Sequence, residues 1–305
     1  RIPQGRMDVN LEPSFFSRNT GFDDEEDEKN ALSQECPMET IIFTWCPSKK
    51  ANLKNGMFNT ELLLIGCNTM CSLALRRAVE CGKKKMNLLG SLVLEEAPIS
   101  SMSAANPTIA QQTCLFYNLP STKLTIAMVG GDLPASSVFS VAETIFKQFD
   151  CKNVILLDTT MTATAEADKE KLSSLACIET SEASSSKDLD IIECKYLSPP
   201  SMIRGLGAAL MVHCEVKRIP ARLYTAFEDM HRTLDTCLVF DALLSSSPIA
   251  LIPKNILSME LSNKRLEIKD VAEKAGINWE TPRRAQQLVY TEGGTNAPPP
   301  DGIYI

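Results

Sequence analysis

The chain has 305 residues, of which 44 % are hydrophobic and 23 % charged, a mixture typical of globular proteins with a buried core. Its 31 basic against 38 acidic residues give a net charge of −7. This balance argues against a general nucleic-acid or anionic-membrane binder, because neutralising phosphates requires a basic surface. No apolar run approaches the roughly 20 residues of a membrane-spanning helix, and the first residues contain no apolar stretch like that of a secretory signal.

The cysteines indicate the compartment. They number eleven, which is odd, and they are scattered without any C-x-x-C spacing. Several stand in apolar stretches, as Cys114 does, where a thiol behaves as a small hydrophobic group. We therefore expect reduced thiols and a cytoplasmic protein, with association to the nucleus or endoplasmic reticulum left open.

The first part of the chain, residues 1–55, is expected to be an acidic and largely disordered segment. Six consecutive acids, Asp23–Glu28, repel one another and cannot share a core. They fit a solvated spacer better than an acidic interaction tail. Within this part, the apolar piece Thr40–Trp45 could pair as a strand or dock on the folded body.

The second part, residues 56–290, is expected to be an α/β domain. Short apolar runs alternate with amphipathic stretches, which is typical of a central sheet flanked by helices. Residues 160–187, rich in Ser, Thr and Ala, are interpreted as a flexible insertion. In chain order, we expect strands at 61–66, 88–94, 114–119, 124–129, 154–157, 189–194 and 219–224, and helices at 69–81, from Ser136/Ser137 to about 149, and at 202–216, 236–244 and 268–275.

The last part, residues 291–305, differs again. A Gly- and Pro-rich stretch, unable to form a helix or strand, ends in Ile303, Tyr304 and Ile305. Three apolar residues on an extended polar tether are hard to explain as core. A tail that packs back on the body is the alternative.

A search for catalytic, cofactor or metal motifs finds none. The chain has no P-loop, no G-x-S-x-G elbow and no zinc spacing around its two histidines, His213 and His231. His213 is interpreted as a packed side chain of a helix and His231 as a solvated one. We therefore expect a chain that is not an enzyme and binds no cofactor or metal.

Two weaker signals concern strand ends, where α/β proteins place their sites. Asp158 ends an apolar strand and is either a functional carboxylate or an ordinary cap, the cap being preferred. Gly205 and Gly207 form a G-x-G at a helix start, which could face a phosphate. The rest of a dinucleotide fingerprint is missing, so close helix–sheet packing is the preferred explanation. Gly130–Asp132 is read as a turn.

One stretch of the chain carries a family resemblance. Its main residues are Leu206, Ala208–Ala209, Cys214, Ile219–Ala221 and Leu223–Tyr224, continuing through Asp229 and Leu234–Asp235. This stretch resembles the family of proteasome assembly chaperone 1. Weaker similarity includes Ile65–Gly66, Asn68, Phe116–Tyr117 and the helix ending at Phe146, and the chain closes on a hydrophobic-Tyr-any (HbYX) motif like that of this family and of proteasome activators. The resemblance covers roughly residues 60–305.

The resemblance implies a fold similar to nucleoside phosphorylases without their active site. It also implies a heterodimer with proteasome assembly chaperone 2, bound to the outer face of the proteasome α-ring. There the tail residues Ile303, Tyr304 and Ile305 would enter a pocket between α-subunits, and the chaperone would block off-pathway ring association and premature activator binding.

Three features depart from the family pattern: Gly207, Arg222 and the insertion 160–187. Two other functions stay open. A nucleoside phosphorylase or hydrolase-like enzyme would show convergent acids in a pocket near Asp158 or Gly205. A proteasome activator would use the same tail.

Overall fold

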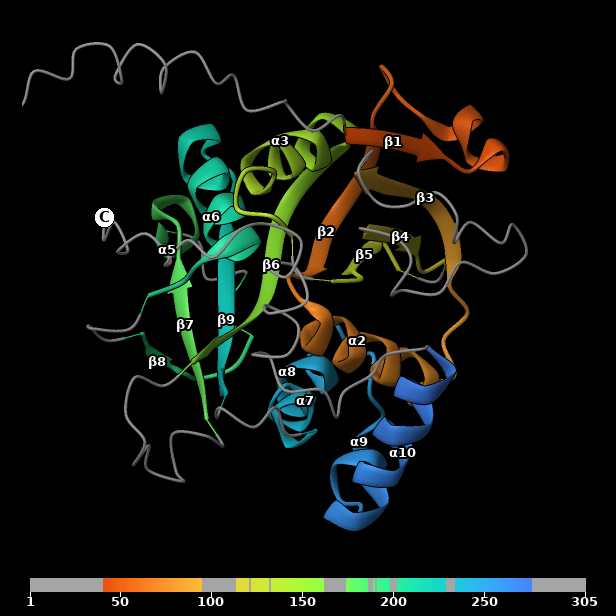
Figure 1. Ribbon diagram of the computed structural model, residues 1–305, viewed down its shortest axis with the longest axis vertical. Helices are drawn as coiled ribbons and strands as arrows, with labels where there is room; N and C mark the ends of the chain where they lie inside the picture. Colours follow the sequence, from red (N-terminus) through yellow and green to blue (C-terminus); the bar gives the residue numbers. More distant parts are fainter. Residues whose placement is uncertain are drawn as a thin grey trace, which may run out of the picture. The chain divides into compact units, whose positions relative to one another are not determined.

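The computed structural model describes residues 41–94, 114–120, 122–131, 133–161, 174–185, 189, 191–197, 202–228 and 234–275. These residues form one mixed sheet with helices on both faces, which confirms the α/β expectation (Figure 1). The strands are β1 (Ile41–Trp45), β2 (Phe58–Gly66), β3 (Asn87–Leu94), β4 (Cys114–Asn118), β5 (Leu124–Val129), β6 (Phe149–Met161), β7 (Leu175–Glu179), β8 (Lys195–Tyr196) and β9 (Ala221–Glu228).

The described helices lie between groups of strands, and the last four follow β9. Most are short, and four have more than ten residues. They are η1 (Pro47–Asn52), α2 (Thr69–Cys81), α3 (Val138–Gln148), α5 (Ser181–Ser185), α6 (Gly205–Lys217), α7 (Asp235–Val239), α8 (Asp241–Ser245), α9 (Lys254–Leu257) and α10 (Leu261–Lys274).

The strand order is β1-β3-β4-β5-β2-β6-β9-β7-β8. The central strands β5, β2, β6 and β9 run parallel, while β1, β3 and β4 on one side and β7 on the other join antiparallel. The parallel strands are apolar on both faces, as expected for a sheet covered by helices on each side. The carboxyl ends of β2, β6 and β9 therefore lie along one edge of the sheet.

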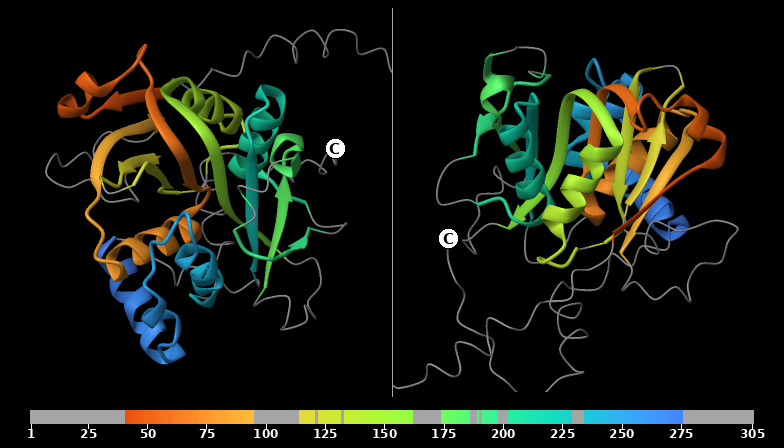
Figure 2. Two further views of the ribbon diagram at one scale, coloured as in Figure 1. Left: turned by 180° about the vertical axis from the view of Figure 1, so that it is seen from behind. Right: turned by 90° about the horizontal axis from the view of Figure 1, so that it is seen from above.

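The two faces of the sheet have separate cores. Leu62 and Leu64 of β2 point to the layer of α2, α7, α8 and α10, whereas Leu63 and Ile65 point to α3 and α6. Figure 2 shows these two helical layers on opposite sides of the strands. On the α3–α6 side, β1 adds aromatic rings to the core: Phe43 and Trp45 contact Phe116 and Phe149.

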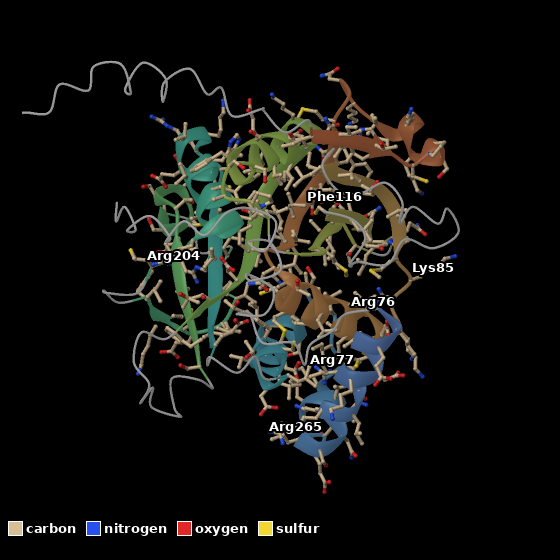
Figure 3. All side chains as sticks on the ribbon, in the orientation of Figure 1. Arg76, Arg77, Lys85, Phe116, Arg204 and Arg265 are labelled. Atoms are coloured by element: carbon tan, nitrogen blue, oxygen red, sulfur yellow. The ribbon has the colours of Figure 1, made fainter. Side chains whose placement is uncertain are left out.

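A buried ion cluster holds the last helix in place. The Arg77 guanidinium on α2 is 1 % exposed and donates to Asp241 of α8 at 2.5 Å and to Glu267 of α10 at 3.4 Å. Lys264 of α10 lies 3.4 Å from the second Asp241 oxygen. Figure 3 shows Arg77 beside α10. Buried charges require such partners, so the cluster fixes α10 against α2 and α8.

Several sequence expectations were wrong in detail. The segment 160–187 is not simply an insertion, because β7 and α5 lie within it and β7 pairs with β9 while burying Ala176 and Cys177. Residues 191–194 are not a strand: the Leu189 carbonyl accepts from the Ile191 amide and the Tyr224 hydroxyl instead of a ladder partner. Ile41–Trp45 forms strand β1, which confirms one of the two expectations for this piece, and the folded unit therefore begins before residue 56.

The helices also differ in extent. Residues 236–244 form two short helices separated at Phe240, and α10 begins seven residues earlier than expected. Ser137 takes the N-cap position of α3, but its hydroxyl donates to the Pro134 carbonyl at 2.9 Å and not to the helix. Residues 1–40 and 276–305, which include the acidic run and the tail, lie outside the described residues.

Candidate functional site

The carboxyl edge of the parallel strands is where chemistry in an open α/β sheet is expected. At this edge Asn68 follows β2 and caps α2, its side-chain oxygen accepting from the Cys71 amide at 3.0 Å. Its side-chain NH₂ donates to the Asp158 carboxylate at 3.0 Å and to the Thr159 hydroxyl at 2.8 Å. All the polar atoms of the Asn68 side chain are therefore engaged within the chain.

Asp158 on β6 is 6 % exposed and lies at the centre of this edge. One carboxylate oxygen accepts from Asn68 and from the Thr159 amide at 2.8 Å. The other lies so close to α6 that a Cβ on Gly207 would be 2.1 Å from it. Only glycine leaves room for this approach, which accounts for the glycine at position 207.

The placement of Asp158 closes a potential anion site. The first turn of α6 has no side-chain cap, and a helix N-terminus attracts negative charge. The Asp158 carboxylate lies against Gly207 in that first turn and supplies negative charge there from within the protein. The Gly205–Gly207 signal is thus explained by close packing. Contrary to the sequence expectation, Asp158 does not end its strand, because β6 continues to Met161. Its carboxylate accepts from Asn68 and from the Thr159 amide.

The other chemistry-bearing side chains described here are poorly placed for catalysis. Burial, reinforced by the negative charge of Asp158, raises the pKa of the Cys67 and Cys71 thiols well above its usual range. A nucleophilic cysteine needs the opposite shift. Among the described residues, no cluster of three or more His, Cys, Asp or Glu side chains could hold a metal ion.

His213 lies elsewhere, on α6 against the α3 helix. Its ring stacks on Phe146 with centroids 4.6 Å apart and planes within 3°. Burial and the nearby Lys217 lower the pKa of His213, so it is neutral near pH 7. It is a packed side chain, as expected; His231 lies outside the described residues.

A small hollow opens beside His213, at the end of the sheet opposite Asp158. Its volume is about 230 Å³, and Phe146, Phe149, Cys151 and Lys217 are among its lining residues. This is smaller than the ~300–1,000 Å³ of ligand pockets. Burial and Asp150 raise the pKa of Cys151 to about 12, which keeps it a thiol.

The second departure from the family pattern, Arg222, also has an internal explanation. Its Nε donates to Glu179 of β7 at 3.1 Å, and the Tyr196 hydroxyl donates to the same carboxylate. Arg222 is 7 % exposed, so this pairing stabilises a charge inside the fold. The acceptor belongs to the segment interpreted as an insertion, and that segment therefore pairs with the core.

Exposed apolar side chains, which sequence reasoning did not single out, form a different kind of candidate. Phe139 on α3 and Val212 and Val216 on α6 are 61 %, 52 % and 73 % exposed. The signal was present in the sequence: Val212 and Val216 are four residues apart, on the side of α6 opposite its buried residues. The predicted tail residues Ile303, Tyr304 and Ile305 lie outside the described part of the chain.

Comparison with known proteins identifies the family. A family model described as "Proteasome assembly chaperone 4" matches residues 18–273, well over half of the chain. The chain belongs to the proteasome assembly chaperone family. This agrees with the resemblance seen in residues 206–235 and with the closed strand edge.

Curated relatives of the family share modest identity with the chain. A protein named "Proteasome assembly chaperone 1" from Bos taurus is 27 % identical over 164 residues, covering 52 % of this chain and 56 % of that protein. The relative of the same name from Danio rerio is 27 % identical over 158 residues, 48 % of this chain and 55 % of its own length. The chain thus spans about half the length of the curated relatives it matches.

Solved structures support the fold. Pyrococcus furiosus PbaA, described as "an archaeal homolog of proteasome-assembly chaperone", has a TM-score of 0.54 at 15 % identity, covering 82 % of this chain and 99 % of that one. A Thermoplasma acidophilum protein of unknown function has a TM-score of 0.53 at 12 % identity, covering 82 % and 100 %. The chain therefore shares the fold of an assembly-chaperone homologue.

Proposed function

We propose that this chain is a non-catalytic chaperone for assembly of the core proteasome. The match of residues 18–273 to the family model carries the proposal. The strand edge supports it, because Asn68 bonds to Asp158 and Gly207 lies against the Asp158 carboxylate where an enzyme of this fold would bind substrate.

The chain would bind the outer face of the α-ring through its tail. With Ile305 as the terminal residue, its carboxylate pairs with a basic side chain in a pocket between two α-subunits. Tyr304 buries its ring and hydrogen-bonds its hydroxyl, while Ile303 fills an apolar recess. Burying each side chain contributes about 1.5–3 kcal/mol, and ordering the tether offsets much of this.

A tail that binds weakly needs a second contact. We propose that the folded body supplies it, as a heterodimer with proteasome assembly chaperone 2 that lies on the ring. The tether then makes the second binding event intramolecular, which raises the overall affinity without a new pocket. Occupying the outer face would keep wrong α-ring pairings and activators away until the core particle matures.

The proposed location is the cytoplasm. Among the described residues all cysteines are free, and six of the ten are buried. Reduced thiols are the usual state of cysteines in that compartment. Within the described part of the chain, no helix combines the length and apolarity needed to cross a membrane.

The experiment is a binding titration with purified α-ring. We expect the chain lacking Ile303–Ile305 to bind at least tenfold more weakly than the intact chain. Adding one alanine after Ile305 displaces the carboxylate and should weaken binding similarly. Tyr290→Ala, a tyrosine change immediately before the tail and outside the motif, is the matched control and should bind normally.

Equal binding of the intact and shortened chains would show that the tail is not the anchor. A peptidase assay with mature core particle separates the two proteasome roles. An assembly chaperone leaves peptide hydrolysis unchanged, whereas stimulation would indicate an activator.

A further inference from the structure

The hollow beside His213 has the size of a site for one small molecule. It is lined by residues from the last turns of α3 and α6 and from the start of β6, and the two helices pack side by side, as Figure 1 and Figure 2 show. Its volume of about 230 Å³ is too small for a drug-sized ligand. It exceeds the ~150 Å³ of a cavity that holds one benzene molecule. The hollow therefore has room for a molecule of about the size of one amino acid.

The wall of the hollow is largely apolar and aromatic. Phe146 and Phe149 are buried, and Cys151 and Ile219 are partly buried. Burial raises the pKa of Cys151 and lowers that of His213, so both side chains are uncharged near pH 7. An aromatic ring of a ligand would gain burial and ring contacts against such a wall.

Two opposite charges flank this apolar wall. Lys217 is exposed at the end of α6, and Asp150 is exposed at the start of β6, where one of its oxygens accepts from the Asn59 side-chain amide at 3.0 Å. Within the described residues neither forms an ion pair, and their charged atoms are more than 4.0 Å apart. Glu143 of α3 lies near Lys217 but pairs with Lys147 at 2.9 Å. The hollow thus offers one unpaired cation and one unpaired anion.

This combination indicates the chemical class of the ligand. A carboxylate can pair with Lys217 and an ammonium group with Asp150, so a molecule that carries both groups beside an aromatic ring is complementary to the hollow. A ligand with a carboxylate alone would bring its charge near that of Asp150, and an amine alone would meet Lys217. An aromatic side chain within a partner's polypeptide carries neither charge.

We propose that the hollow binds a free amino acid with an aromatic side chain, such as phenylalanine. The ring of the ligand lies against Phe146 and Phe149, its carboxylate pairs with Lys217, and its ammonium group pairs with Asp150. The site is independent of the proposed chaperone role, which does not require a small ligand.

The test is isothermal titration calorimetry of the full chain with three matched ligands. L-Phenylalanine carries both charges, 3-phenylpropionate lacks the ammonium group, and 2-phenylethylamine lacks the carboxylate. We expect phenylalanine to bind with a dissociation constant of about a millimolar, as its size allows. The other two should bind at least threefold more weakly.

Two surface variants separate the roles of the charges. Lys217→Gln should weaken phenylalanine binding at least threefold without weakening that of 2-phenylethylamine. Asp150→Asn should weaken phenylalanine binding similarly without weakening that of 3-phenylpropionate. Lys152→Gln removes an exposed lysine from β6 outside the lining of the hollow and is the matched control, which should stay within twofold of the unmodified chain. Circular dichroism shows whether the variants fold.

Three outcomes would overturn the proposal. Absence of heat at ten millimolar phenylalanine would remove the site. Binding that neither Lys217→Gln nor Asp150→Asn weakens would place the ligand elsewhere. If uncharged 3-phenylpropionamide bound as tightly as phenylalanine, the hollow would instead be a pocket for an aromatic side chain of a partner protein.

Discussion

The carboxyl edge of the parallel strands and the exposed apolar side chains of α3 and α6 (Phe139, Val212 and Val216) differ in how much they contribute to the fold. At the strand edge, polar groups from two distant segments, Asn68 and Asp158–Thr159, bond to one another, and the Asp158 carboxylate lies against Gly207 in the first turn of α6. On α3 and α6, the side chains of Phe139, Val212 and Val216 are each more than half exposed in the described part of the chain. The polar groups at the strand edge therefore stabilise the fold, whereas these exposed apolar side chains contribute little to it.

This comparison predicts the largest effect at Gly207. Gly207→Ala places a methyl group 2.1 Å from the Asp158 carboxylate, so the Asp158 side chain must leave its bonds to Asn68 and Thr159, or α6 must shift. We expect the free energy of unfolding to fall by about 3 kcal/mol, measured by chemical denaturation. Gly131→Ala, where a Cβ would meet no atom within 4 Å, is the control and should stay near the parent value. Equal stability of the two variants would contradict the close approach of Asp158 to α6 at Gly207.

Asn68→Ala should have the next largest effect. It removes the cap of α2 and leaves the Asp158 carboxylate without one of its donors. We expect a loss of about 2 kcal/mol in the free energy of unfolding. Asn68→Asp retains the cap acceptor but places two carboxylates together, so it should be no more stable than Asn68→Ala. An unchanged free energy of unfolding in Asn68→Ala would show that the Asn68 side chain does not stabilise the strand edge.

The sequence predicted the features that depend on neighbouring residues and missed those that depend on residues far apart along the chain. The apolar run Val154–Leu157 and the helix at 69–81 are local patterns, and both were predicted correctly. Strand β7 was missed because its short, small-residue sequence gains its structure from pairing with β9. The contacts of Asp158 could not be predicted, since Asn68 and Gly207 lie 90 and 49 residues away along the chain and meet only in the folded sheet.

A smaller effect concerns His213 and pH. Because its folded pKa lies below the unfolded value, the folded form takes up fewer protons as pH falls. The free energy of unfolding should therefore decrease between about pH 7 and 5.5. His213→Phe keeps a ring against Phe146 but cannot titrate, so its stability should vary less over this window. Thermal unfolding as a function of pH measures this. An identical pH dependence of the parent chain and His213→Phe would show that His213 does not contribute to the pH dependence of stability.

The smallest effect on stability is expected at the exposed apolar residues of α3 and α6. Val216→Ser and Phe139→Ser remove side chains that are mostly in water, so unfolding free energies should change by about 0.5 kcal/mol or less. Thermal or chemical denaturation of the isolated chain measures this. A loss of several kcal/mol would show that these residues belong to the core, and the contrast between the two regions would disappear.

The account as a whole is tested most directly by reconstituted assembly. Purified α-subunits would be mixed with the intact chain and its proposed partner subunit, and the yield of complete α-rings followed by native gel and mass spectrometry. The account predicts more correct rings and fewer off-pathway assemblies at stoichiometric amounts of chaperone, with Asn68, Asp158 and Gly207 contributing only through stability. An unchanged yield and distribution of α-ring species would contradict it.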